Sequence, residues 1–242
     1  MAAIAAGRKA LKFWIATRFC DKVVAVSRTT QTNLERSPLA AHSRIVTLYN
    51  AAAPSNNSSS APICEPHEFA VVNVARHVPA KDLLTLLRAM VLVREKAQDV
   101  VLALAGSGPL TEELKRSAAA LRVDDGVHFL GEQPDVGGIL QQAKVYAMSS
   151  VNEGLPISLL EAMAAGIPQI VTAVGGMREI MELSQAGVMV PPKDATAIAD
   201  AILRFRDDEP RRLECGRRAR ECYEKHFTPS RMASDYESLY RG

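Results

Sequence analysis

The chain has 242 residues, of which 48% are hydrophobic and 23% are charged, as is typical of a folded globular protein. This composition excludes global disorder, a collagen-like repeat and a small disulfide-stapled scaffold. At roughly 100–200 residues per domain, the length allows one complete domain and a substantial part of another.

The net charge of +2 hides an uneven distribution. Residues 1–50 carry eight Lys and Arg against two acidic residues, whereas residues 51–203 carry 11 against 17. An acidic main body with 5% aromatic residues argues against nucleic-acid binding. No apolar run reaches the ~18–20 residues of a membrane span, and the first seven residues are too short for a secretory signal. The four cysteines form no C-x-x-C pair. We therefore expect a cytoplasmic chain with reduced thiols and no metal.

Residues 1–50 read as a piece of an α/β domain. Residues 7–20 place Leu11, Trp14, Ile15 and Phe19 at helical spacing among basic residues. This pattern predicts a helix packed on a sheet, with a helix lying on a membrane surface as the alternative. A strand over 22–27, a helix over 30–36 and a strand over 44–49 follow. Residues 51–66, rich in Pro, Ser and Asn, predict a linker.

From residue 67 to 206, short apolar strands alternate with amphipathic helices. Parallel strands need such crossover helices, so the pattern predicts a doubly wound parallel sheet of the Rossmann-like α/β class. Residues 207–242 predict two charged helices, 209–226 and 229–240. The expected strands are 69–75, 100–105, 127–130, 145–149, 169–172 and 188–190, and the helices are 81–97, 110–121, 136–142, 156–165, 177–183 and 195–205.

In an open parallel sheet, ligands bind beyond the carboxyl ends of the strands, so the loops there deserve scrutiny. Arg76 and Lys81 bracket the turn after the first strand, and Lys81 is expected to open a helix. Two cations at a helix start fit an anion such as a diphosphate, although solvated surface charges explain the spacing equally well. The G-S-G-P turn at 106–109 permits close backbone approach to a ligand. It is not a dinucleotide fingerprint, because Thr111 occupies the third glycine position.

The segment from Ser149 to Pro168 carries two glutamates. Glu153 and Gly154 lie on a loop, and Glu161 falls within the following helix, where it could accept hydrogen bonds from ribose hydroxyls. The amides of Gly154 and Leu155 form a potential anion site at the helix start. The helical rise of ~7.5 Å from 156 to 161 exceeds the ~5–5.5 Å that separates the carboxylates of a retaining glycosidase, which argues against a hydrolytic pair. A solvated helical glutamate is the plain alternative.

Together the order R-x4-K, G-S-G-P, F-L-G-E, E-G-L-P-I-S-L-L-E-A-M-A-A-G-I-P and V-G-G-M-R-E-I resembles glycosyltransferase family 4, retaining enzymes of the GT-B fold. The resemblance covers residues 69 to about 205. It implies that Arg76 and Lys81 grip the donor diphosphate, with the Gly154 and Leu155 amides alongside. It also implies that Glu161 binds the ribose and that Glu153 acts catalytically on the transferred sugar.

The resemblance further assigns the nucleobase to the 130–134 loop, with Leu130 and Gln133 as candidates, and places residues 174–176 beside the sugar. Two departures are mild: Ala75 replaces a glycine, and Ala51 stands where an Asn-Gly pair is common. A third is larger, because the N-terminal acceptor-binding domain is represented only by residues 1–50.

The implied function is a hexosyl-type retaining glycosyltransferase that uses a nucleotide-sugar as substrate and needs no cofactor. Its acceptor would be a glycan or a lipid-linked sugar. A donor-binding subunit without activity of its own is the alternative, and an epimerase or phosphorylase relative is a third reading. Residues 1–50 would meet a partner domain, a second copy of the chain or the inner membrane face.

Overall fold

The structure is a computed structural model that describes residues 20–37, 44–54 and 61–241. Near the N-terminus, β1 (Val23–Ala25) and β2 (Ile45–Thr47) form a two-stranded parallel sheet, joined through α2 (Arg28–Glu35). The strands and the helix lie close to where the sequence predicts them. The basic helix predicted over residues 7–20 falls almost entirely outside the described residues.

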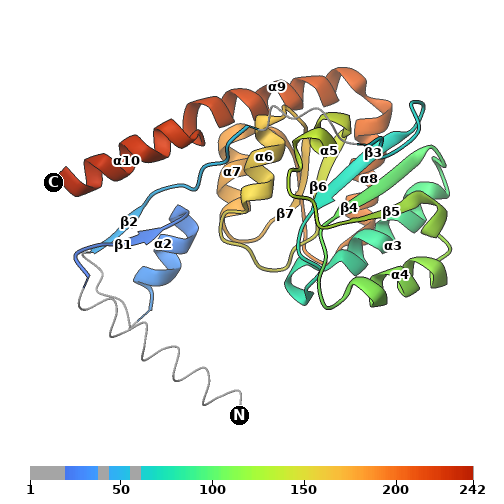
Figure 1. The fold of residues 1–242 in the computed structure, drawn as a ribbon, viewed down its shortest axis with the longest axis horizontal. Coiled ribbons are helices and arrows are strands. Elements are labelled where there is room, and N and C mark those ends of the chain that lie inside the picture. Colours follow the sequence, from blue (N-terminus) through green and yellow to red (C-terminus); the bar gives the residue numbers. More distant parts are fainter. Residues whose placement is uncertain (1–19, 38–43, 55–60, 242) are drawn as a thin grey trace, which may run out of the picture.

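A six-stranded parallel sheet dominates the rest of the chain (Figure 1). Its strands run in the order β5-β4-β3-β6-β7-β8, so the direction of winding reverses between β3 and β6. This arrangement confirms the doubly wound, Rossmann-like fold. The strands are β3 (Phe69–Val74), β4 (Val100–Ala105), β5 (Val127–Gly131), β6 (Val145–Met148), β7 (Gln169–Thr172) and β8 (Gly187–Val190).

Helices cover both faces of this sheet, which explains why its strands are apolar on both sides. One face packs against α3 (Leu83–Arg94), α4 (Thr111–Ala120) and α8 (Ala195–Asp207). The opposite face packs against α5 (Gly137–Gln142), α6 (Ile157–Ala164), α7 (Gly176–Ser184) and α9 (Glu209–His226). Side chains such as Leu86, Met90 and Leu159 are fully buried, each worth ~1.5–3 kcal/mol of transfer free energy.

The C-terminal helices return toward the N-terminal segment. The Tyr223 hydroxyl of α9 donates to the Ala52 carbonyl at 2.7 Å, and the Ala52 amide donates to the Phe227 carbonyl at 3.2 Å. The rings of Tyr49 and Phe227 meet edge to face, 5.5 Å apart. These contacts fasten the chain just after β2 to the end of α9. From there α10 (Pro229–Arg241) runs toward the end of the molecule that carries β1, α2 and β2 (Figure 1).

One predicted helix start is wrong. The sequence predicts a helix from Lys81, but residues Pro79–Lys81 form a separate 3-10 turn (η2), and α3 begins at Leu83. The break is Asp82, whose left-handed backbone (φ 46°) cannot continue a helix. A second 3-10 turn, η3 (Asp124–Gly126), precedes β5. Among the described residues, no helix combines the length and apolar character needed to cross a membrane. The four cysteines are free thiols.

Candidate functional site

The candidate site lies where the winding of the sheet reverses, at the carboxyl ends of β3 and β6. The loops that follow these two strands are joined directly. The Val151 amide donates to the Ala80 carbonyl at 2.9 Å, and the Ser149 hydroxyl donates to the Lys81 carbonyl at 3.0 Å. Because neighbouring parallel strands end at the same edge, residues 70 positions apart in the sequence share one crevice.

Lys81 and Glu153 form an ion pair across this crevice. The Lys81 ammonium donates to Glu153 Oε1, which also accepts from the Ser150 hydroxyl at 2.7 Å. Both side chains are largely shielded, with exposed fractions of 21% for Lys81 and 10% for Glu153. Lys81 does not open a helix, as the sequence analysis expected, but ends the 3-10 turn η2. It is neutralised by a carboxylate, and both predicted residues come together.

Arg76 has a different environment. Its side chain is exposed and has no hydrogen bond or ion pair with the described residues. It borders a cavity of about 330 Å³ between the ends of β3 and β4 and residues 132–136. Gly106 forms part of this cavity at φ +126°, and a Cβ there would lie 2.0 Å from the Ala75 carbonyl oxygen. A glycine is thus required where the two loops touch. The exposed Arg76 guanidinium, free of partners among the described residues, remains open to a ligand.

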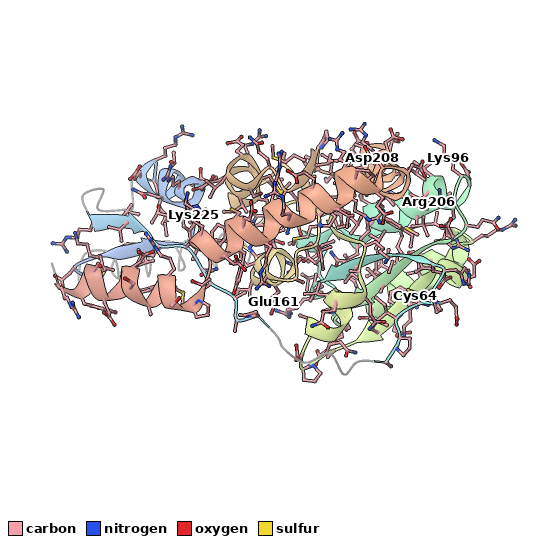
Figure 2. The ribbon with its side chains drawn as sticks, turned by 90° about the horizontal axis from the view of Figure 1, so that it is seen from above. Cys64, Lys96, Glu161, Arg206, Asp208 and Lys225 are labelled. Carbon is pink, nitrogen blue, oxygen red and sulfur yellow. The ribbon has the colours of Figure 1, made fainter. Side chains whose placement is uncertain are left out.

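Glu161 borders a second, larger cavity of about 630 Å³. Burial and the nearby Asp135 carboxylate raise the pKa of Glu161 above its ordinary value. Figure 2 shows Glu161 on α6, beside the long helix α9. Arg220 of α9 lines the same cavity, donating to the Ala164 carbonyl and, at 2.6 Å, to Glu224. The cavity therefore combines a carboxylate of raised pKa with other residues from α5, α6 and α9.

Gln133 connects the two cavities, since it lines both. Its side-chain amide donates to the Leu130 carbonyl at 2.7 Å, which fixes the turn after β5. The Leu130 side chain instead packs against the hydrophobic core and lines neither cavity. Of the two nucleobase candidates, only Gln133 reaches the crevice with its side chain. Asp135, whose carboxylate accepts from the Gly137 amide at 2.8 Å, is a lining residue that the sequence analysis did not single out.

The loop from Glu153 to Leu155 is packed tightly between two neighbours. Gly175 lies so close that a Cβ there would be 1.8 Å from the Glu153 carbonyl oxygen, and the Gly176 amide donates to the Gly154 carbonyl at 2.9 Å. The Asn50 side chain donates to the Leu155 carbonyl at 3.0 Å. The helix begins one residue later than predicted, at Ile157. The predicted residues thus lie on a rigid loop at the start of α6.

Glu179 of α7 is a further residue that the sequence did not single out. Its carboxylate accepts from the Arg28 amide at 2.9 Å, from the Thr29 amide at 3.3 Å and from the Tyr49 hydroxyl. Burial and this bond raise the pKa of Tyr49 to about 12. The contact spans 150 residues, so only its place in the V-G-G-M-R-E-I segment could have drawn attention to it. It ties the β1–α2–β2 unit to the loops of the site.

Comparison with known proteins decides the family. A family model described as glycosyl transferases group 1 matches residues 62–222. This chain belongs to that family. Among curated relatives, the N-acetyl-alpha-D-glucosaminyl L-malate synthase of Bacillus anthracis is 34% identical over 142 residues, covering 59% of this chain and 37% of the relative. The putative colanic acid biosynthesis glycosyltransferase WcaL of Escherichia coli is 30% identical, covering 70% of this chain and 44% of the relative.

Two solved structures share the fold of this chain. HepE of Anabaena, solved with UDP and glucose, has a TM-score of 0.85 at 20% identity and covers 94% of this chain and 64% of its own. Sucrose-phosphate synthase of Thermosynechococcus elongatus has a TM-score of 0.86 at 24% identity and covers 97% and 61%. The chain thus spans less than half the length of these two curated relatives and under two thirds of both solved structures.

Proposed function

We propose that this group 1 glycosyltransferase chain supplies the donor-binding half of a retaining enzyme, which transfers a hexosyl group from a nucleoside diphosphate sugar. The observation that carries the proposal is the pair of cavities that meet at Gln133, one bordered by Arg76 and the other by Glu161, with Lys81 on the same loop as Arg76. A cation at one cavity and a carboxylate at the other match a diphosphate and a ribose. HepE, of the same fold, was solved with UDP and glucose, which supports this choice.

The diphosphate would lie against Arg76 and Lys81. Charge-assisted hydrogen bonds to phosphate oxygens are about twice as strong as neutral ones, and they strengthen as the leaving group gains charge. Lys81 would exchange its bond with Glu153 for one with a phosphate oxygen, which frees the Glu153 carboxylate. The Gly154 and Leu155 amides at the start of α6 would add further donors. This chain's residues therefore stabilise the departing nucleotide by position and charge.

Glu153 and Glu161 would divide the rest of the donor between them. Glu153, released from Lys81, would accept hydrogen bonds from the transferred sugar as the catalytic carboxylate. Glu161 would accept hydrogen bonds from the ribose hydroxyls, which would stabilise its buried carboxylate. Gln133, with the Leu130 backbone that it holds, would face the nucleobase. The 174–176 loop, which contacts the Glu153 backbone, would border the transferred sugar.

The proposal includes no resident cofactor and no metal, because the cationic side chains of Arg76 and Lys81 would neutralise the charge of the diphosphate. The expected result is that EDTA leaves nucleotide binding unchanged. Loss of binding on chelation, restored by a divalent cation, would show instead that a metal bridges the phosphates.

The acceptor half would come from elsewhere. Within the described chain, the β1–β2 sheet has two strands, and its buried apolar residues are Ala25 and Ile45. A two-stranded unit with open strand edges needs another part of a protein, or another surface, that covers those edges. We infer that the cover is the remainder of an acceptor domain, which would hold a glycan or lipid-linked acceptor. A second copy or an anionic inner membrane surface contacting residues 1–50 would be the other covers.

Turnover separates the enzyme from a donor-binding subunit. UDP-, GDP- and ADP-linked hexoses would be incubated with this chain, alone and with acceptors, while release of the nucleoside diphosphate is measured. The proposal predicts release that Glu153→Gln abolishes and that the exposed control Glu182→Gln preserves. Tight binding without release, with or without acceptor, would favour the subunit. Sedimentation with anionic vesicles, at the same protein concentration, would distinguish membrane contact from self-association.

A further inference from the structure

His77 is a buried histidine beside the proposed diphosphate site. It follows Arg76 directly, yet only 1% of its surface is exposed. Its Nδ1 lies 2.9 Å from the hydroxyl of Thr111, the first residue of α4, and its ring meets Phe129 of β5 edge to face at 6.2 Å. Its Nε2 is buried and has no hydrogen-bond partner within the part of the chain that the structure describes. A buried histidine with one unpaired nitrogen costs stability, so its place beside this site calls for a reason.

The partner hydroxyl of Thr111 closes the 106–110 turn. It accepts from the Gly108 amide at 3.0 Å and donates to the Gly108 carbonyl at 2.9 Å. A threonine hydroxyl has a single proton. When that proton is used on Gly108, Nδ1–H of His77 must be the donor to Thr111, and Nε2 is left as the bare acceptor. Burial and the Lys115 ammonium of α4 lower the pKa of His77, which favours this neutral ring.

The backbone of His77 holds the same turn. Its amide donates to the Ser107 carbonyl at 2.8 Å, and its carbonyl accepts from the Leu110 amide at 3.1 Å. A Cβ on Gly108 would lie 2.5 Å from the His77 carbonyl oxygen, so the two backbone segments are in direct contact. Residue 77 therefore fixes the 106–110 turn to the loop after β3 from both its backbone and its ring.

This link matters because both linked segments line the smaller cavity. Arg76, Gly106 and Ser107 all border the space of about 330 Å³. The Arg76 side chain has no hydrogen bond or ion pair among the described residues, so its placement depends on the backbone of the loop that carries it, where the Arg76 carbonyl accepts from the Val78 amide at 2.9 Å. We propose that His77 is a positioning residue for the donor: its ring, bound to Thr111, sets the distance between the Arg76 loop and the 106–108 backbone. This role rests on the proposed function.

Two matched pairs of variants test the role. The side-chain nitrogen of asparagine occupies the place of Nδ1, so His77→Asn keeps the donor to Thr111, while His77→Leu removes it at similar volume. Likewise Thr111→Ser keeps the hydroxyl and Thr111→Val removes it. Affinity for UDP, GDP and ADP would be measured by calorimetry at a temperature where every variant is folded, with thermal unfolding followed separately.

We expect His77→Leu and Thr111→Val each to weaken binding of the preferred diphosphate about tenfold, the scale of one lost hydrogen bond. His77→Asn and Thr111→Ser should stay within about threefold of wild type. Equal affinity in His77→Leu and wild type, whatever the change in unfolding temperature, would overturn the role and leave the proposed function standing. If the wild-type chain binds none of the three nucleotides, the proposed function fails and the role of His77 fails with it.

Discussion

The ion pair between Lys81 and Glu153 leads to a prediction with opposite effects on stability and binding. Ion pairs on a protein surface contribute ~0–1 kcal/mol, and removing one partner of a fully buried pair costs ~3–5 kcal/mol. Lys81 is 21% exposed and Glu153 10% exposed, so their pair lies between these limits. We therefore expect Glu153→Gln to lower the free energy of unfolding by about 2 kcal/mol.

Binding should change in the other direction. In the Glu153→Gln variant, a bound diphosphate restores a counter-charge to Lys81 and no longer displaces a carboxylate. Recovery of most of that energy predicts roughly tenfold tighter binding of a nucleoside diphosphate. A nucleotide-sugar should gain less, because the variant has lost the proposed acceptor for the sugar hydroxyls.

Urea unfolding and titration calorimetry measure the two effects. Glu182→Gln is the control, because it changes the net charge equally at an exposed position of α7. Weaker diphosphate binding in Glu153→Gln, or tightening that Glu182→Gln reproduces, would refute the exchange of partners at Lys81.

Three further predictions concern single residues. Glu161→Gln should weaken the binding of diphosphates and nucleotide-sugars alike, yet stabilise the free protein at pH 7. Because the pKa of Glu161 is raised, the destabilisation caused by its buried charge is absent below the ordinary carboxyl range and grows as pH rises through the folded pKa. The stability curves of the two proteins should therefore converge at acid pH. Gln169→Leu should raise the free energy of unfolding by ~1–3 kcal/mol in urea titration, because both side-chain amide atoms are buried with no partner among the described residues, and an unchanged midpoint would show that they are paired. Gly106→Ala should abolish diphosphate binding or lower the thermal midpoint, since its Cβ would clash with Ala75, and a variant that is wild-type in both would contradict the contact.

The sequence predicted the layered architecture well, for a physical reason. Strands such as 100–105 are apolar at every position because both faces are covered, and Gly or Pro marks many of their ends. The motif segment then placed Glu153 and Glu161 on the correct loop and helix. Strand order was beyond the sequence analysis, because it depends on packing between elements distant along the chain.

The errors and omissions of the sequence analysis also have physical causes. Pro79 and Lys81 resemble a helix start, but the left-handed Asp82 separates a 3-10 turn from α3. The Lys81–Glu153 pair spans 72 residues and the Arg28–Glu179 contact 151, so no spacing rule links them. His77 occupies an unspecified position of the R-x4-K motif, and its role becomes visible only through its bond to Thr111. The three boundaries between the four predicted segments and the roles of the site residues remain predictions.

The central claim is that this crevice binds a nucleoside diphosphate through Arg76 and Lys81. Calorimetric titration of the chain with UDP, GDP and ADP tests it most directly, with Arg88→Ala as a control at an exposed position of α3. We predict that at least one nucleotide binds with one-to-one stoichiometry, that Arg76→Ala and Lys81→Ala each weaken it by ~1.5–3 kcal/mol, and that Arg88→Ala does not. Binding of none of the three, or equal affinity in all four proteins, would contradict the claim.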